Sequence, residues 1–325
     1  MIISRTPLRM SFVGGGSDLP VFYRKYGGAV LSTAIDRYVY VTVNRKFDDR
    51  IRISYSRTEE ARTVDRIKHP LVREAMKLTG ISGGIEITSI ADIPSKGSGL
   101  GSSSTFTVGL LNALHAYAGR HAGAERLSKE ACEIEIERCG EPIGKQDQYA
   151  AGFGGLNLIQ FNPDDSVSVE PVICKRETIQ QLQSHIVVFY TGVTRSASGI
   201  LKHQCSVLAT EKKKCDVTRQ MVKLAHTLCQ ELRANRVATF GEIIHEGWLL
   251  KKSLTAGITT DAIDAWYARA RRAGAIGGKL LGAGTGGFLM FYAPPDRHEA
   301  IARALELRRL EIQFEPQGSR IIFVH

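Results

Sequence analysis

The residues best suited to chemistry in this chain form a glycine- and serine-rich segment, PSKGSGLGSSS at 94–104. Directly after it, apolar residues recur at three- to four-residue intervals from Phe106 to Tyr117, which predicts a helix over 102–118. A glycine-rich turn that opens a helix presents free backbone N–H groups and the positive end of the helix dipole, so it is suited to binding phosphate. The three serines add hydroxyls that suit a phosphate or its Mg²⁺.

Three familiar nucleotide-binding signatures do not fit this segment. A Walker A motif ends in Gly-Lys-Ser/Thr, but Gly278-Lys279 is followed by Leu280. A dinucleotide-binding fingerprint requires glycine where Ser102 stands. The protein-kinase triplets His-Arg-Asp and Asp-Phe-Gly do not occur in the sequence. The phosphate loop therefore belongs to another family.

Two further segments accompany the loop. Residues 5–18, RTPLRMSFVGGGSD, predict a short strand broken by three glycines and closed by a carboxylate, and residues 279–287, KLLGAGTGG, form a second glycine-dense loop. In order and spacing, the three segments resemble the three motifs of the GHMP kinase superfamily, named for galacto-, homoserine, mevalonate and phosphomevalonate kinases. The resemblance spans nearly the whole chain and implies an ATP-dependent small-molecule kinase.

The first of these motifs indicates a branch of the superfamily. Galactokinases carry Gly-Glu-His-Thr-Asp where this chain has Gly-Gly-Gly-Ser-Asp at 14–18, a form similar to that of kinases acting on D-glycero-D-manno-heptose 7-phosphate or L-fucose. Residues 69–74 and 144–155 are similar to the same branch. The resemblance implies phosphorylation of heptose 7-phosphate, with the anomeric hydroxyl as the expected acceptor. A neutral-sugar kinase such as L-fucokinase and a non-catalytic sugar or nucleotide sensor stay as alternatives.

The resemblance also implies the catalytic residues. Asp147 lies in a glycine-flanked polar loop, where a turn carboxylate bonded to its own backbone is the competing interpretation. It matches the family's catalytic aspartate, which accepts or orients the proton of the sugar hydroxyl. Arg9 matches the basic residue beside that aspartate, where it would keep the carboxylate ionised and stabilise charge on the transferred phosphoryl group.

ATP and Mg²⁺ are the implied cofactors. Ser103 and Glu137 are the expected Mg²⁺ ligands, whereas Glu133 and Glu135 are expected on a solvated helix face. The residues expected to contact ATP are Pro94, Gly97, Gly99, Leu100, Gly101, Ser102, Ser103 and Ser104.

The substrate is expected to contact the first and third motifs. The residues assigned to it are Gly15, Gly16, Ser17, Asp18 and Gly284. A carboxylate such as Asp18 accepts two hydrogen bonds from sugar hydroxyls at once. A phosphorylated sugar also needs a cation, for which Arg195 is expected, with Lys145 and Lys202 as alternatives and a solvated surface arginine as the competing interpretation.

The family's fold sets the expected frame. It is α+β, with a ribosomal-protein-S5-like N-terminal domain over 1–180 and a ferredoxin-like C-terminal domain over 181–325. Local patterns predict strands at 38–43 and 51–54 that pair across a polar turn. Further strands are expected at 84–88, 156–159, 185–190 and 288–292, and further helices near 128–139, 198–233, 237–253 and 261–273.

Composition agrees with an enzyme of this kind. The 325 residues are 43% hydrophobic and 23% charged, enough for a sizeable core. Six cysteines without a CxxC pair indicate a reducing, cytoplasmic compartment, and no apolar run approaches a membrane span. The net charge of +10 fits a solvated basic surface, attraction of anionic substrates, or nucleic-acid binding. We expect a small-molecule partner and neither nucleic acid nor a membrane, while the sequence does not indicate the oligomeric state.

Overall fold

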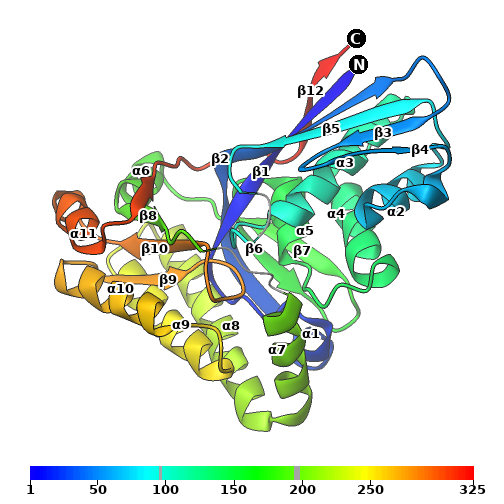
Figure 1. The fold of residues 1–325 in the computed structure, drawn as a ribbon. Coiled ribbons are helices and arrows are strands. Elements are labelled where there is room, and N and C mark those ends of the chain that lie inside the picture. The colour runs from blue at the N-terminus through cyan, green and yellow to red at the C-terminus, as the bar shows by residue number, and fades with distance from the viewer. Residues whose placement is uncertain (95–96, 194–197) are drawn as a thin grey trace.

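The computed structural model of the protein describes residues 1–94, 97–193 and 198–325, and its described part contains two β-sheets (Figure 1). The larger sheet has the strand order β12-β1-β2-β5-β3-β4, and β6 pairs with β2 and with β7. Its strands are β1 (Ile2–Val13), β2 (Gly28–Arg45), β3 (Ile51–Ser54), β4 (Thr58–Ala61), β5 (Ile85–Ala91), β6 (Leu156–Phe161), β7 (Val167–Pro171) and β12 (Arg320–Val324).

Helices of the first half pack on this sheet, on one another or on the second half (Figure 1). They are α1 (Pro20–Tyr26), η1 (Val64–Arg66), α2 (Pro70–Thr79), α3 (Ser102–Tyr117), α4 (Ala124–Cys132), the π-helical turn η2 (Glu133–Arg138) and α5 (Gln146–Phe153). Most residues of α3 are buried, because it packs on β1 and β2 while α2, α4 and α5 surround it. The core of the first half therefore fixes where α3 begins.

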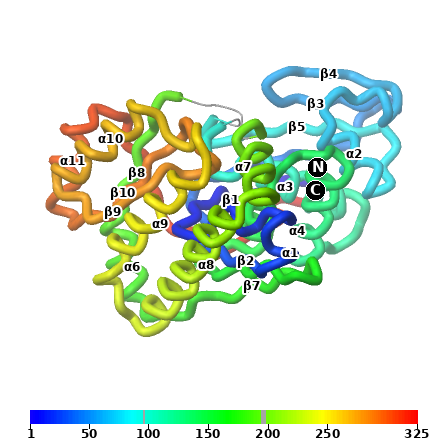
Figure 2. Tube along the Cα trace, turned by 90° about the horizontal axis from the view of Figure 1, so that it is seen from below, coloured from blue at the N-terminus to red at the C-terminus, as the bar shows by residue number. Residues whose placement is uncertain are grey.

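The second half is built on a four-stranded antiparallel sheet with the order β11-β8-β10-β9. Its strands are β8 (Ile186–Tyr190), β9 (Gly277–Leu280), β10 (Phe288–Tyr292) and β11 (Arg308–Leu310). The helices are α6 (Arg176–Ser184), α7 (Ser198–Thr210), α8 (Lys212–Arg233), α9 (Phe240–Leu254), α10 (Asp261–Arg272), η3 (Pro295–Arg297) and α11 (His298–Leu305). Figure 2 shows α7 beside α1 of the first half, a contact that brings residues far apart in sequence together.

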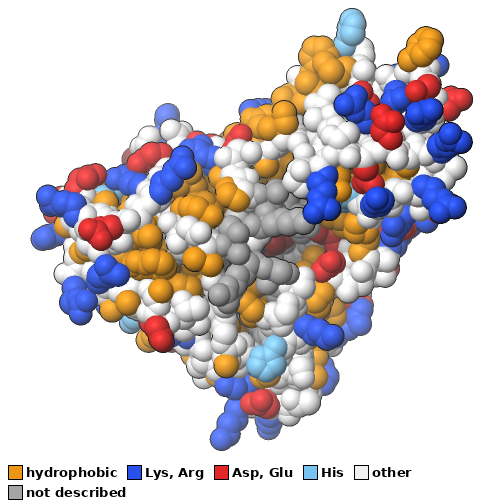
Figure 3. Space-filling model, viewed as in Figure 1, with side chains coloured by type: hydrophobic (Ala, Val, Ile, Leu, Met, Phe, Trp, Pro, Cys, Tyr) orange, Lys and Arg blue, Asp and Glu red, His pale blue; other side chains and the backbone are white. Residues whose placement is uncertain are grey.

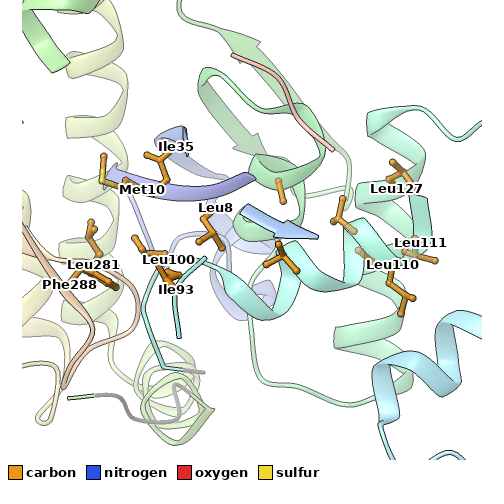
Figure 4. Packing of buried hydrophobic residues seen from close by; sticks show 14 of the residues in the cluster. Leu8, Met10, Ile35, Ile93, Leu100, Leu110, Leu111, Leu127, Leu281 and Phe288 are labelled. Atoms are coloured by element: carbon orange, nitrogen blue, oxygen red, sulfur yellow. The ribbon is translucent and has the colours of Figure 1, made fainter. Parts of the chain in front are cut away.

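One hydrophobic core cluster spans the two halves, and a second cluster lies within the second half. Helix α8 packs against β1 and β2 as well as α9, so it joins the two sheets. In Figure 4 the side chain of Leu100, from the glycine-rich segment, lies near Ile93, Leu281 and Phe288. Burial of these side chains anchors the segments on either side of the two glycine loops.

The structure confirms the predicted helix at 102–118 and the strands at 84–88, 156–159, 185–190 and 288–292. The predicted pairing of 38–43 with 51–54 is wrong, because β5 lies between β2 and β3 and pairs with both. The short N-terminal strand is in fact the twelve-residue β1, which pairs with β2 along most of its length.

The division of the chain at residue 180 falls within α6, between the strands of the two sheets. The last strand departs from that division, because β12 returns to the first sheet and pairs with β1, which places the two termini side by side (Figure 1). None of the described helices is long and apolar enough to cross a membrane. On the face shown in Figure 3, Lys and Arg side chains are spread over both halves and interspersed with Asp and Glu.

Candidate active site

A cavity of about 550 Å³ lies where the glycine loops meet the helices of both halves. Its lining comes from the first motif, the loop before α3, the turn before α5, helices α7 and α9, and the third motif. The polar side chains that line it are Arg9, Ser11, Asp18, Ser98, Ser102, Ser103, Ser104, Glu135, Glu141, Gln146, Asp147, Ser198, Gln204 and Lys251.

The start of α3 forms the phosphate side of the cavity. Gly101 is the N-cap residue, with φ +79°, and no side chain caps the helix, so the first N–H groups of α3 lack a side-chain acceptor. A Cβ at Gly101 would lie 3.3 Å from the Asp147 carboxylate, and one at Gly99 would lie 2.3 Å from the carbonyl oxygen of Leu281. Only glycine therefore lets this loop pass between Asp147 and the third motif.

Arg9 and Asp147 meet directly beneath this loop. Arg9 Nε donates to Asp147 Oδ1 over 2.7 Å, and its Nη2 lies 2.6 Å from the same oxygen. Arg9 Nη1 also donates to the carbonyl oxygen of Gly99 over 2.8 Å, which ties the pair to the phosphate loop. The Arg9 side chain is buried, whereas Asp147 keeps a quarter of its side chain exposed toward the cavity. Asp147 lies in the first turn of α5, not in the loop that the sequence predicts.

Asp18 forms a second carboxylate in the same cavity. It accepts hydrogen bonds from the backbone N–H of Gly16 at 2.9 Å and of Gln146 at 3.2 Å, and from Gln146 Nε2 at 3.1 Å. Burial raises its pKa, and the negative charge of nearby Asp147 adds to the rise. Gln146 follows Lys145 at the start of α5, so one helix start positions both carboxylates.

A third carboxylate, Glu135, faces the start of α3. It accepts hydrogen bonds from Ser103 Oγ at 3.1 Å and from Gln148 Nε2 at 2.7 Å. Burial raises its pKa to about 7, because its hydrogen-bond partners are neutral and do not fully offset the cost of removing the charge from water. The prediction that Glu135 belongs to a solvated face is wrong.

Glu137, the predicted partner of Ser103, is exposed and does not line the cavity. The cause is the π-helical turn at Glu133–Arg138, in which Cys139 N–H donates to the carbonyl oxygen of Ile134, five residues back. The wider turn changes which residues of this segment share a face, and Glu135 is the one that bonds Ser103.

Some of the remaining predicted residues line the cavity, and others lie behind or outside its lining. Gly15, Gly16, Gly97, Ser102 and Ser104 line the cavity as expected. Ser17, Pro94, Gly284 and Leu100 do not line it. Ser17 is buried, with its hydroxyl bonded to the backbone of Ala29. Pro94 is exposed outside the lining, and Gly284 packs against Ile258. The side chain of Leu100 is in the core, and its carbonyl oxygen accepts a hydrogen bond from the backbone N–H of Arg9.

The predicted phosphate anchors have different outcomes. Lys145 Nζ bonds Asp165 and lies over the Tyr23 ring, so it does not line the cavity. Lys202 is exposed and is also absent from the lining. Arg195 falls outside the described residues and stays a prediction.

Lys251 and Gln204 are among the lining residues that were not predicted from the sequence. Lys251 on α9 is buried, and its Nζ donates to the carbonyl oxygen of Gly282; burial lowers its pKa to about 8. Gln204 on α7 is 2% exposed, and its Nε2 lies against Gly16 with no hydrogen-bond partner among the described residues. Neither stands in a motif, and their distance in sequence from the glycine loops gave no signal.

The described residues fit a nucleotide better than a bound metal alone. They contain no group of three or more His, Cys, Asp and Glu side chains able to hold an ion. Ser103 and Glu135 supply one hydroxyl and one carboxylate beside uncapped helix N–H groups, a donor set that matches Mg²⁺ sharing its coordination with phosphate oxygens and water.

Comparison with known proteins agrees with this geometry. The family model described as "GHMP kinases N terminal domain" matches residues 65–155, and that described as "GHMP kinases C terminal" matches residues 228–310. The chain is 31% identical to a D-glycero-alpha-D-manno-heptose 7-phosphate kinase of Campylobacter jejuni, over 96% of this chain and 95% of that protein. It is 26% identical to a bifunctional fucokinase/GDP-fucose pyrophosphorylase of Arabidopsis thaliana, over 94% of this chain but 30% of that protein.

Solved structures give the same picture. A D-glycero-D-manno-heptose 1-phosphate kinase from Bacteroides thetaiotaomicron superposes with a TM-score of 0.83 at 28% identity, covering 100% of both chains. A galactokinase of Lactococcus lactis complexed with galactose superposes with a TM-score of 0.79 at 18% identity, over 98% of this chain and 94% of that one, which shows the shared fold alone.

Proposed function

Because the chain belongs to the GHMP kinase family and is an ATP-dependent sugar kinase, we propose that its acceptor is D-glycero-D-manno-heptose 7-phosphate, phosphorylated on the anomeric hydroxyl. The relatives above support a heptose phosphate, since two of them carry that sugar in their names. The observation that carries the transfer chemistry is the Arg9–Asp147 pair, which lies against the phosphate loop in the same cavity as Asp18, and the 31% identity to a heptose 7-phosphate kinase supports the choice of acceptor.

The residues divide the work as follows in this proposal. The N–H groups at the start of α3 hold the phosphates of ATP. Asp18 accepts hydrogen bonds from sugar hydroxyls, and its contacts with Gly16 and Gln146 keep it oriented. Asp147 receives the proton of the attacking hydroxyl, while Arg9 holds that carboxylate in place.

Magnesium would be held by Ser103 and Glu135 beside the nucleotide. When bound, Mg²⁺ neutralises charge on the phosphate oxygens. Glu135 must ionise to act as a ligand; burial raises its pKa to about 7, and a cation beside the carboxylate would favour the ionised form.

The substrate proposal is tested by ADP release with a panel of acceptors at saturating ATP. We expect the highest kcat/KM with heptose 7-phosphate, exceeding that for unphosphorylated heptose by roughly ten- to a hundredfold, because a charge-assisted bond to phosphate contributes about 1.5–3 kcal/mol. Heptose 1-phosphate tests the position of the existing phosphate, and L-fucose, galactose and mannose serve as neutral comparisons. A preference for L-fucose or free heptose would replace the proposal with a neutral-sugar kinase, and ADP release with none of these acceptors would favour the non-catalytic sensor.

A further inference from the structure

Lys251 is a buried cation in the cavity wall that the roles above do not use. Its side chain is 7% exposed, and Nζ donates to the carbonyl oxygen of Gly282. It forms no ion pair with any carboxylate of the described chain, so at least two of its three donor hydrogens lack a protein partner there. Burying a charge without a counter-ion is costly, which indicates that a ligand supplies the missing acceptors.

The position of Lys251 identifies that ligand. A Cβ at Gly282 would lie 2.3 Å from the Cα of Gly99, so the third motif and the phosphate loop touch at these two glycines. The carbonyl oxygen of Gly99 accepts from Arg9, and that of Gly282 accepts from Lys251. The two touching loops therefore place both cations at the same junction, where Arg9 also holds Asp147.

We propose that Lys251 is a further catalytic residue, whose ammonium group binds the phosphoryl group while it passes from ATP to the sugar. In that step the sugar oxygen bonds to the γ-phosphorus, and the bond from that phosphorus to the β–γ bridging oxygen breaks with its electron pair going to ADP. The hydroxyl proton passes to Asp147, and Lys251 keeps its own protons. The inference rests on the roles proposed above for Asp147 and the phosphate loop.

The main test compares Lys251→Met with Lys252→Met, the neighbouring lysine on α9, whose Nζ bonds Asp264 at 2.6 Å outside the cavity lining. We expect Lys251→Met to lower kcat by about 10²-fold, the size typical for loss of one transition-state donor, and Lys252→Met to keep it within about twofold. Calorimetry should give dissociation constants for ATP and sugar within about threefold of wild type. The melting temperature of Lys251→Met should be unchanged or raised, because methionine removes a buried charge.

The pH dependence of kcat/KM distinguishes a catalytic role of Lys251 from a purely structural one. The charged groups around Lys251 are Arg9 and Lys279 on the strands, Asp18 in the first motif and Asp147 on α5. Burial and the Arg9 charge lower the pKa of Lys251 to about 8, so the charged form is lost as the pH rises past that value. We expect wild-type kcat/KM to fall above pH 8 and Lys251→Arg, which stays charged, to lack that fall.

Two outcomes would overturn the inference: a folded Lys251→Met with kcat within threefold of wild type, or a folded Lys251→Arg with an unchanged alkaline fall. Should the methionine variant fail to fold, the arginine variant alone decides by its pH profile. If the wild-type enzyme prefers a sugar other than heptose 7-phosphate, the same comparison is made with that sugar. Failure of the substrate proposal is thereby distinguished from failure of the Lys251 assignment.

Discussion

The side of the cavity that we propose for phosphate, the phosphate side, is constructed differently from the side that we propose for the sugar, the sugar side. The phosphate side is lined mainly by backbone and small side chains of the glycine-rich segment 97–104 and of residues 282–283, with α3 starting directly behind the first segment. The sugar side consists of side chains from separate elements: Asp18 from the first motif, Gln146 from α5 and Gln204 from α7. A site made of backbone is encoded locally, whereas a site made of side chains depends on how distant elements pack.

This difference separates phosphate recognition, which does not depend on the acceptor, from recognition of the sugar, which is selective. Backbone N–H groups at a helix start recognise any phosphate of suitable shape, so the first side fits a nucleotide irrespective of the acceptor. The second side sets which hydroxyls find partners, because an unpaired buried polar group penalises the wrong sugar. Asp147 lies between the two sides, bonded to Arg9 and beside Gly101.

The largest expected effect lies at this boundary. Asp147→Asn keeps the size of the side chain but removes the group that receives the proton, so we expect kcat to fall by about 10²-fold or more. Circular dichroism and ATP affinity should stay close to wild type. Asp216→Asn, an exposed substitution on α8, is the matched control. Near-normal turnover of Asp147→Asn would remove the residue from the mechanism.

The same contrast explains what could be predicted from the sequence. The start of α3 and the glycine loops could be predicted because clustered glycines and regularly spaced apolar residues are recognisable in a short stretch of sequence. In the structure, several of these glycines have positive φ. The pairing of 38–43 with 51–54 failed because β5, more than thirty residues after Ile51, inserts between the two strands. Which strands are neighbours depends on contacts between residues far apart in sequence, and short sequence patterns do not contain that information.

The carboxylate beside Ser103 is a second place where the structure differs from the prediction. The family resemblance, with its carboxylate a few residues before the catalytic aspartate, selected Glu137 as the partner of Ser103, whereas the structure places Glu135 beside Ser103 in the π-helical turn. Gln204 and Lys251 went unpredicted because only the packing of α7 and α9 against the first motif brings them to the cavity.

A smaller effect is expected on the phosphate side. Glu135→Gln should raise the Mg²⁺ concentration for half-maximal activity by about tenfold, whereas Glu137→Gln should leave it unchanged, because only Glu135 faces Ser103. Titration of both variants with Mg²⁺ at fixed ATP makes the comparison. A shift in Glu137→Gln alone would restore the sequence-based assignment.

The raised pKa of Glu135 adds a pH signature to that test. With a pKa of about 7 in the folded protein, the residue stabilises the metal-free fold most at low pH, and this contribution is lost as the pH rises toward and through 7. A cation that pairs with the carboxylate favours its ionised form. We therefore expect Mg²⁺ with ATP to raise the melting temperature more at pH 8 than at pH 6, and Glu135→Gln to reduce that difference. An equal shift at both pH values in the wild type would contradict the assignment.

The smallest effect is expected on the sugar side, where a substitution removes a single neutral hydrogen bond. Gln204 stands on the face of α7 that also presents Ser198 and Leu201 to the cavity, at a spacing of three residues. Its Nε2 has no partner in the described protein, so a sugar hydroxyl is its natural acceptor. Gln204→Ala should lower kcat/KM for the sugar by about five- to tenfold, the size of one neutral hydrogen bond, with ATP affinity unchanged. Gln220→Ala, at an exposed position on α8, controls for loss of a surface amide. If Gln204→Ala instead weakens ATP binding and leaves sugar kinetics intact, α7 belongs to the nucleotide, and the division of the cavity into two sides is wrong.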